Sequence, residues 1–197
     1  MNSKYIYLVF TKTGTWLSKL INLFSHEKYA HSSISFDNSF LKMYSFGRIN
    51  PDNPFSGGFV EENLSEGVYK KFLKCECLIY RVSITEEQYF SLQQQIANFL
   101  REKDKYGYNF LGLFGVLFNI PIKRQNKYFC SQFVAEILIK SGIYSSRNVP
   151  ELIRTQELIA IRKKEFIYEG FVNEFLKYPD LTGNSYVVAH AGYHPHT

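Results

Sequence analysis

Apolar residues recur along this chain with two different periods, which predict both strands and helices. Alternation or a short apolar run is typical of strands, and apolar residues three or four apart are typical of helices. The predicted strands cover residues 4–10, 29–37, 40–47 and 74–84, with two short closing strands at residues 159–161 and 165–168. The predicted helices cover residues 15–24, 86–103 and 131–140, and another helix begins near residues 155–158.

Three stretches lack a sustained period. Residues 48–67 contain Asn-Pro and Gly-Gly pairs and are interpreted as a long ordered loop of the kind that often forms the wall of a site. Residues 106–118 are apolar but interrupted by three glycines, which fits a buried helix or a hydrophobic lid. Residues 179–197 are expected to be a poorly ordered tail. Its histidines, which are not interpreted as a metal site, are His190, His194 and His196.

The composition is that of a single globular domain, which we expect over residues 1–178. The chain has 197 residues, of which 45% are hydrophobic and 17% aromatic, enough for a full core. The first apolar run is too short for a signal peptide, and no stretch reaches the length of a membrane span. Three cysteines form no paired framework, so a reducing, cytoplasmic location is expected.

The formal charge of +5 is moderate and is not concentrated in a dense basic block. A nucleic-acid partner is therefore not expected, whereas peripheral contact with an acidic membrane stays open. The stripe of residues 15–24, led by Trp16, is interpreted as core packing, with membrane contact as the alternative. The sequence contains neither a dinucleotide-binding glycine loop nor a phosphate-binding lysine motif, so no cofactor is expected.

The segment 127–138 (KYFCSQFVAEIL) places a cysteine where an amphipathic helix begins. Phe133, Val134, Ile137 and Leu138 follow Cys130 at helical spacing. The free N–H groups and positive dipole end of a helix start favour a thiolate over a thiol, which a nucleophilic cysteine requires. The alternative is that Cys130 is only a small hydrophobe packed under the helix, and a second chemical group is needed to decide between them.

That second group is a histidine. His31 lies near the start of the predicted strand 29–37, where a side chain is exposed enough to titrate. In a hairpin centred near Asn38, Ser45 would lie opposite His31 and could accept a hydrogen bond from its ring. Glu61 and Glu62, in the predicted long loop, are the carboxylates that could reach the imidazole from elsewhere.

The other two cysteines are predicted to be structural. Cys75 and Cys77 share one face of the predicted strand 74–84 with Ile79. A Cys-x-Cys pair on a strand can bind a metal, but no matching second pair occurs in the sequence. These thiols are therefore expected to be packed, and no metal site is predicted.

The order of the two motifs, a strand-borne His31 followed about a hundred residues later by a helix-borne Cys130, suggests a family. The sequence resembles the circularly permuted NlpC-like branch of papain-fold cysteine hydrolases, the YiiX-like group, which is related in fold to lecithin:retinol acyltransferases. The resemblance extends to about residue 176. It rests on residues 29–34 (YAHSSI) and 128–134 (YFCSQFV), supported by residues 44–48 (YSFGR) and 54–59 (PFSGGF).

The resemblance implies an α+β fold of the permuted papain-like type. In that family, a helix bearing the cysteine at its N-terminus packs against a small antiparallel sheet or barrel that carries the histidine. A third polar residue, often acidic, lies on the strand after the histidine. Here that region offers Tyr44 and Ser45, so Ser45 is the first candidate for orienting His31, with Glu62 as its substitute.

A histidine beside an activated thiol predicts nucleophilic acyl transfer. His31 would take the proton of Cys130, and the thiolate would attack a carbonyl to form a thioester. The backbone N–H of Cys130 is the expected oxyanion donor, with Tyr44 or Tyr108 as a second donor. The leading hypothesis is an amidase or peptidase that acts on a small peptide or amino-acid amide. The alternatives are a lipid acyltransferase or phospholipase that uses the same pair, and a non-catalytic binding module.

Overall fold

The computed structural model describes residues 3–13, 27–49, 56–72 and 74–177. The predicted helix 15–24 and the predicted tail 179–197 lie outside these ranges. The described residues form an α+β structure built on one antiparallel sheet, whose strand order is β4-β3-β2-β1-β5-β8. The strands are β1 Lys4–Lys12, β2 His31–Ser35, β3 Met43–Arg48, β4 Gly57–Glu62, β5 Glu76–Ile84 and β8 Lys164–Phe171.

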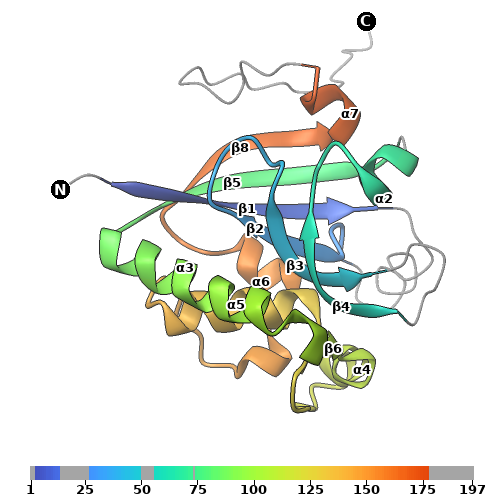
Figure 1. Ribbon diagram of the computed structural model, residues 1–197, viewed down its shortest axis with the longest axis vertical. Helices are drawn as coiled ribbons and strands as arrows, with labels where there is room; N and C mark the ends of the chain where they lie inside the picture. Colours follow the sequence, from blue (N-terminus) through green and yellow to red (C-terminus); the bar gives the residue numbers. More distant parts are fainter. Residues whose placement is uncertain (1–2, 14–26, 50–55, 73, 178–197) are drawn as a thin grey trace, which may run out of the picture.

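Most of the helices cover one face of this sheet. Figure 1 shows α3, α4, α5 and α6 on that side and α7 on the other. The helices are α2 Gly67–Lys71, α3 Glu86–Arg101, α4 Phe110–Leu117, α5 Cys130–Lys140, α6 Thr155–Ile159 and α7 Val172–Phe175. Two short 3-10 helices, Lys103–Lys105 and Pro150–Leu152, lie between them. A small parallel pair, β6 (Gly107–Tyr108) and β7 (Lys127–Tyr128), precedes α4 and α5 respectively.

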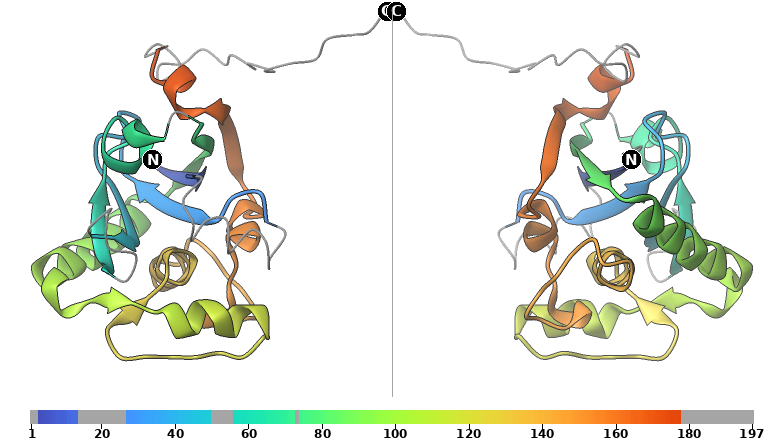
Figure 2. Two further views of the ribbon diagram at one scale, coloured as in Figure 1. Left: turned by 90° about the vertical axis from the view of Figure 1, so that its right-hand side faces the viewer. Right: turned by 90° about the vertical axis from the view of Figure 1, so that its left-hand side faces the viewer.

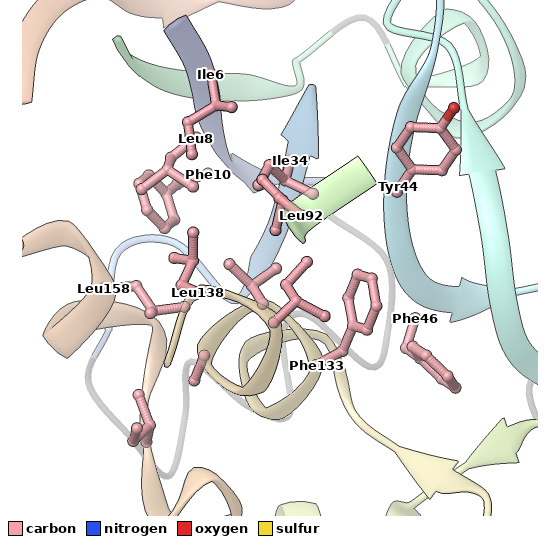
Figure 3. Close-up of a cluster of buried hydrophobic side chains, with 14 of the residues drawn as sticks. Ile6, Leu8, Phe10, Ile34, Tyr44, Phe46, Leu92, Phe133, Leu138 and Leu158 are labelled. Carbon is pink, nitrogen blue, oxygen red and sulfur yellow. The ribbon is translucent and has the colours of Figure 1, made fainter. Parts of the chain in front are cut away.

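The continuous apolar run of β1 arises because both faces of the sheet are buried. Ile6, Leu8 and Phe10 point toward α3 and α5, whereas Tyr7 and Val9 belong to a second cluster on the opposite face. Successive side chains of a strand point to opposite faces, so a strand covered on both sides has apolar residues at nearly every position. Figure 3 shows the larger cluster, in which α5 packs Phe133 and Leu138 against the sheet. The fold therefore holds α5 mainly against β2 and β3.

The larger cluster is rich in aromatic rings where α3, α5, β3 and β4 meet. Phe46 of β3 lies 5.2 Å from Phe133 of α5, and Phe59 of β4 lies 5.5 Å from Phe99 of α3, measured between ring centroids. Such ring pairs add specific geometry to apolar burial. They hold β3 and β4 against the helix that begins with Cys130.

The second cluster contains the two cysteines that were predicted to be structural. Cys75 and Cys77 are buried free thiols, packed with Ile79 on the face opposite α5. This confirms the prediction that both thiols are packed, although Cys75 lies just before β5, which begins at Glu76.

Two of the sequence-based assignments are wrong. Residues 48–67 are not a continuous loop, because residues 57–62 form β4, which pairs along its whole length with β3. Two glycines open this strand, and glycine carries no side chain that could show the strand period. Residues 159–161 are not a strand either, since Ile159 ends α6.

The hairpin that carries His31 has a different register from the predicted one. Ile34 pairs with Tyr44 and Ser35 with Met43, so the same register extended by three residues places Gly47, not Ser45, level with His31. The connecting loop is longer than predicted. It is closed by the Ser35 hydroxyl, which donates to the carbonyls of Asp37 (2.9 Å) and Lys42 (3.0 Å). A shift of two residues keeps every side chain on its expected face but changes the neighbours of His31.

None of the helices in the described ranges combines the length and the apolar composition that crossing a bilayer requires.

Candidate active site

Cys130 is the first residue of α5, as predicted. Phe129, the N-cap residue, is apolar and extended, so its side chain leaves the N–H groups of the first helical turn to other acceptors. The Cys130 side chain is buried, and its Sγ lies 3.7 Å from the Ala30 carbonyl oxygen, to which the protonated thiol can donate a weak hydrogen bond. Ala30 directly precedes β2, so the thiol lies at the end of the sheet where His31 begins its strand.

The start of α5 is fixed by the small β6–β7 pair. Tyr128 pairs with Tyr108, and the N–H of Asn109 donates to the Tyr128 carbonyl at 2.9 Å. Phe129 is fully buried in the core. These contacts leave Cys130 little freedom and bring Tyr108 beside it, although 22 residues separate the two in the sequence.

His31 contacts a carboxylate through one ring nitrogen. Its Nε2 lies 2.9 Å and 3.1 Å from the two carboxyl oxygens of Glu62, the last residue of β4. The hydroxyl of Ser33 donates to Glu62 Oε2 at 2.6 Å, and the hydroxyl of Tyr69 in α2 donates to the same oxygen at 3.2 Å. Because Nε2 faces Glu62, Nδ1 is the ring nitrogen that remains for Cys130, whose hydrogen bond and charge are among the causes that raise the pKa of His31.

The three groups shift one another's protonation. Burial raises the pKa of the Cys130 thiol, but the hydrogen bond and positive charge of His31, together with the backbone of Ser32 and Ser131, outweigh burial and lower this pKa below its usual value. Burial also lowers the pKa of His31, but the Glu62 carboxylate and the Cys130 sulfur reverse that effect and raise it well above 6.5. The arrangement thus favours a thiolate–imidazolium pair.

Glu62 is ionised in this arrangement. Burial raises the pKa of its carboxyl, but the charge and hydrogen bond of His31 and the hydroxyls of Ser33 and Tyr69 lower it below its usual value. A carboxylate that accepts several hydrogen bonds remains charged even when it is largely buried. Glu62 therefore supplies a fixed negative charge to the side of the ring that faces away from the thiol.

Ser45 does not orient His31, contrary to the first choice made from the sequence. Its side chain is fully buried and its hydroxyl donates to the Ser32 carbonyl at 2.7 Å. The hairpin register explains this, because Gly47 takes the place level with His31. A side chain at Gly47 would have its Cβ 3.7 Å from Cε1 of His31 and 3.3 Å from Oε1 of Glu62. The missing side chain at Gly47 leaves room for the His31–Glu62 contact.

Of the two tyrosines considered as oxyanion donors, Tyr108 lies at the thiol and Tyr44 does not. Burial first, and then the negative charge of Cys130 and a hydrogen bond with it, raise the pKa of Tyr108 well above its usual value. The Tyr108 hydroxyl also contacts the backbone of Cys130. Tyr44 instead packs its ring on Phe36 and Phe59 in the core.

A cavity of about 730 Å³ adjoins these groups. His31, Glu62, Tyr69 and Tyr108 all contribute to its lining. Further lining residues come from β3 and β4, from the segment 103–108 and from the first residue of α4. The cavity gives a small acyl compound room to approach the His31 ring and the Tyr108 hydroxyl.

Ser33 and Tyr69 are members of the site that sequence reasoning did not select. Ser33 carried a signal, because strand alternation puts it on the same face as His31. Tyr69 carried none, since it lies in a short helix whose position depends on the preceding strand. Glu61, the other carboxylate considered, is exposed on the opposite side of β4 and lies 3.7 Å from Lys42.

Neither a protein-family model, nor a curated protein, nor a solved structure shows a significant match to this chain.

Proposed function

We propose that this protein is a cysteine-dependent hydrolase that cleaves an amide or peptide bond through a thioester intermediate. The observation that carries the proposal is the convergence of Cys130, His31 and Glu62 from a helix start and two strands, beside a cavity that His31 and Glu62 line. A purely structural ion pair between His31 and Glu62 could also shift their pKa values. Such a pair does not require a thiol at a helix N-terminus on the other side of the imidazole, whereas a nucleophilic site does.

In the proposed reaction, the Cys130 thiolate attacks the carbonyl carbon of the substrate and forms a C–S bond while the carbonyl π electrons move to oxygen. The His31 imidazolium gives its proton to the leaving nitrogen, and the C–N bond breaks. Neutral His31 then takes a proton from water, whose oxygen attacks the thioester. The C–S bond breaks, a carboxylic acid leaves and the thiolate is restored.

Two groups would stabilise the oxyanion. The N–H of Cys130 is at the positive end of α5, and the Tyr108 hydroxyl is a donor next to the thiol. Donors of this kind act most strongly where charge develops in the transition state, since they are already oriented before reaction. Glu62 would hold the His31 ring and stabilise its positive charge without taking up the proton.

The same features support assignment to the circularly permuted NlpC-like, papain-fold hydrolases. The histidine strand precedes the cysteine helix in the chain, and the helix packs on an antiparallel sheet. An acidic residue accompanies the histidine, although it comes from β4 rather than from the next strand. The binding-module alternative was motivated by the apparent lack of such an acid, so Glu62 weakens it. A low-pKa thiolate is readily oxidised, so the cytoplasmic location expected from the cysteine count would preserve it.

A panel of peptide and amino-acid p-nitroanilides tests the proposal. We expect release of p-nitroaniline by the wild type and a loss of about a thousandfold or more in Cys130→Ala and His31→Gln. Acid-quenched reactions should contain an acyl adduct on Cys130, detectable by mass spectrometry. Turnover by Cys130→Ala equal to that of the wild type would overturn the proposal.

Thiol labelling tests the same site without a known substrate. Iodoacetamide at neutral pH should modify Cys130 before Cys75 or Cys77, because burial raises the pKa of Cys75 to about 11 and raises that of Cys77 further, whereas His31 lowers that of Cys130. The His31→Gln variant should slow modification of Cys130 alone. Faster labelling of Cys75 or Cys77 in the wild type counts against a reactive Cys130.

A further inference from the structure

Helix α4 exposes an apolar stripe to solvent. Leu111, Phe114 and Phe118 recur at helical spacing and are 55%, 44% and 74% exposed, and Ile120 in the following turn is 55% exposed. The opposite side of α4 is packed, with Gly112, Gly115 and Val116 buried. A helix that is apolar on all sides is normally covered on all sides. We call Leu111, Phe114, Phe118 and Ile120 the α4 surface.

The α4 surface is held in place by hydrogen bonds at both ends of the helix. Asn109 caps the N-terminus by accepting from the Gly112 N–H at 3.0 Å, and its amide donates to the Ile122 carbonyl at 3.0 Å. At the C-terminus, the Arg154 guanidinium donates to the Val116 carbonyl at 2.9 Å. The stripe is therefore presented on a fixed helix, as expected of a binding surface.

The segment that carries and follows the α4 surface is positively charged. Residues 106–127 contain three basic residues, Lys123, Arg124 and Lys127, and no acidic residue. The basic loop begins at Lys123, three residues after Ile120. In both views of Figure 2, α4 and this loop form the lower edge of the molecule, on the far side of α5 from the sheet. Aromatic and aliphatic side chains beside basic ones match the interface of an anionic lipid bilayer.

Helix α4 carries both the α4 surface and, at its first residue, part of the wall of the candidate active site. Phe110, the first residue of α4, lines the same cavity as His31, and its ring centroid lies 4.7 Å from that of Tyr108. We propose that the α4 surface docks on an anionic lipid bilayer and brings the Cys130 site to the membrane surface, so that its carbonyl substrate is a membrane-borne acyl compound. The substrate part rests on the proposed hydrolase function, whereas the docking part does not.

Vesicle co-sedimentation tests the docking. Cys130→Ala protein should bind vesicles of phosphatidylcholine with about 30% phosphatidylglycerol, and bind pure phosphatidylcholine far less. The double variant Leu111→Ser, Phe118→Ser should lower binding to the anionic vesicles by about tenfold or more. Phe90→Ser is the matched control, because Phe90 is a 58% exposed phenylalanine on α3, and it should bind like its parent. Lys123→Glu with Arg124→Glu should abolish the preference for the anionic lipid.

The outcomes separate docking from catalysis. Equal vesicle binding by the double variant and its parent would overturn the docking. The docking would also be overturned if the protein bound no vesicles but self-associated with increasing concentration, and if the double variant abolished this self-association. That result would assign the α4 surface to contact with a second copy of the chain. Turnover of soluble amides without any vesicle binding would support the proposed hydrolase function and overturn the proposed membrane docking. If the protein binds vesicles but its turnover is unchanged by Cys130→Ala, the docking proposal would stand and the proposed hydrolase function would be overturned.

Discussion

At the scale of single residues, the charge of Glu62 sets the protonation of the proposed catalytic pair. This carboxylate raises the pKa of His31, and the protonated imidazole in turn lowers the pKa of Cys130. The chain couples the three groups through one ring, whose Nε2 faces Glu62. A substitution at Glu62 should therefore change the pKa of the Cys130 thiol, although Glu62 acts on it only through the His31 ring.

The Glu62→Gln variant tests this coupling. Loss of the carboxylate lowers the pKa of His31 and raises that of Cys130, so the acid limb of the kcat/KM profile should move to higher pH and the alkaline limb to lower pH. The maximum should fall about tenfold or more. The rate of iodoacetamide labelling against pH reports the thiolate directly and should show the same shift of the acid limb.

Two controls accompany Glu62→Gln. Glu61→Gln removes the neighbouring carboxylate, which lies on the other side of β4, and should leave both limbs in place. Ser45→Ala should also keep the profile, because the Ser45 hydroxyl binds the Ser32 carbonyl rather than the imidazole. A profile that shifts with Ser45→Ala but not with Glu62→Gln would return the orienting role to the serine.

The Tyr108→Phe variant tests the second oxyanion donor. The substitution keeps the ring that packs on Phe110 and removes only the hydroxyl beside Cys130. If the hydroxyl stabilises the transition state, kcat should fall by roughly tenfold to a thousandfold with little change in KM. Steady-state kinetics on the best p-nitroanilide would measure both. A rise in KM alone would make Tyr108 a substrate-binding residue instead.

At the scale of elements, β4 and β6 approach so closely that glycine is required between them. A Cβ added at Gly57 would lie 2.7 Å from the Cβ of Tyr108, and one added at Gly58 would lie 2.6 Å from the Tyr106 carbonyl oxygen. Contacts this short force one of the two elements to move. The position of Tyr108 at the thiol therefore depends on Gly57 of the neighbouring strand.

Gly57→Ala should displace Tyr108 and lower turnover by about tenfold or more, with a loss of stability of about 1–3 kcal/mol from overpacking. Gly107→Ala is the matched control in the same region, because a Cβ there would meet only the Lys127 side chain at 3.7 Å or more. Turnover and urea unfolding of both variants would be compared. Equal effects of the two alanines would show that Tyr108 does not depend on the β4–β6 approach.

At the scale of the whole molecule, the His31–Glu62 pair links stability to pH. The pKa of Glu62 is lowered on folding, so its contribution is present above about pH 4.5 and is lost as pH falls through the folded-state pKa. The pKa of His31 is raised, so its contribution is fully present below pH 6.5 and is lost as pH rises through the folded-state pKa. Both contributions to the free energy of unfolding are therefore present between about pH 4.5 and pH 6.5.

Urea unfolding followed by far-UV circular dichroism tests this linkage. Between about pH 6 and pH 3 the wild type should lose more unfolding free energy than Glu62→Gln, whose amide does not titrate. The Glu61→Gln variant, with its exposed carboxylate replaced, should follow the wild type. An identical acid dependence of Glu62→Gln and the wild type would mean that the pair adds nothing to stability.

The sequence by itself determined most of the elements and the two central residues of the site. Residues 4–10 are apolar because both faces of β1 are covered, and the helix after Cys130 shows its buried stripe directly. These are local signals, since burial repeats with the period of the strand or helix. The same local signals place the starts of β2 and α5, where His31 and Cys130 lie. Both residues could therefore be selected before any contact between them was known.

Only the tertiary structure decided which group holds the His31 ring. The choice between Ser45 and Glu62 depended on a hairpin register that differs by two residues from the predicted one, and on β4, whose opening glycines hide its strand period. Glycine is present there because another backbone approaches, which is a contact between segments distant in sequence. Periodicity reports which face of an element is buried, but it does not report which element covers that face. The pairing of β4 with β3 places Glu62 at His31, and no local pattern contains that pairing.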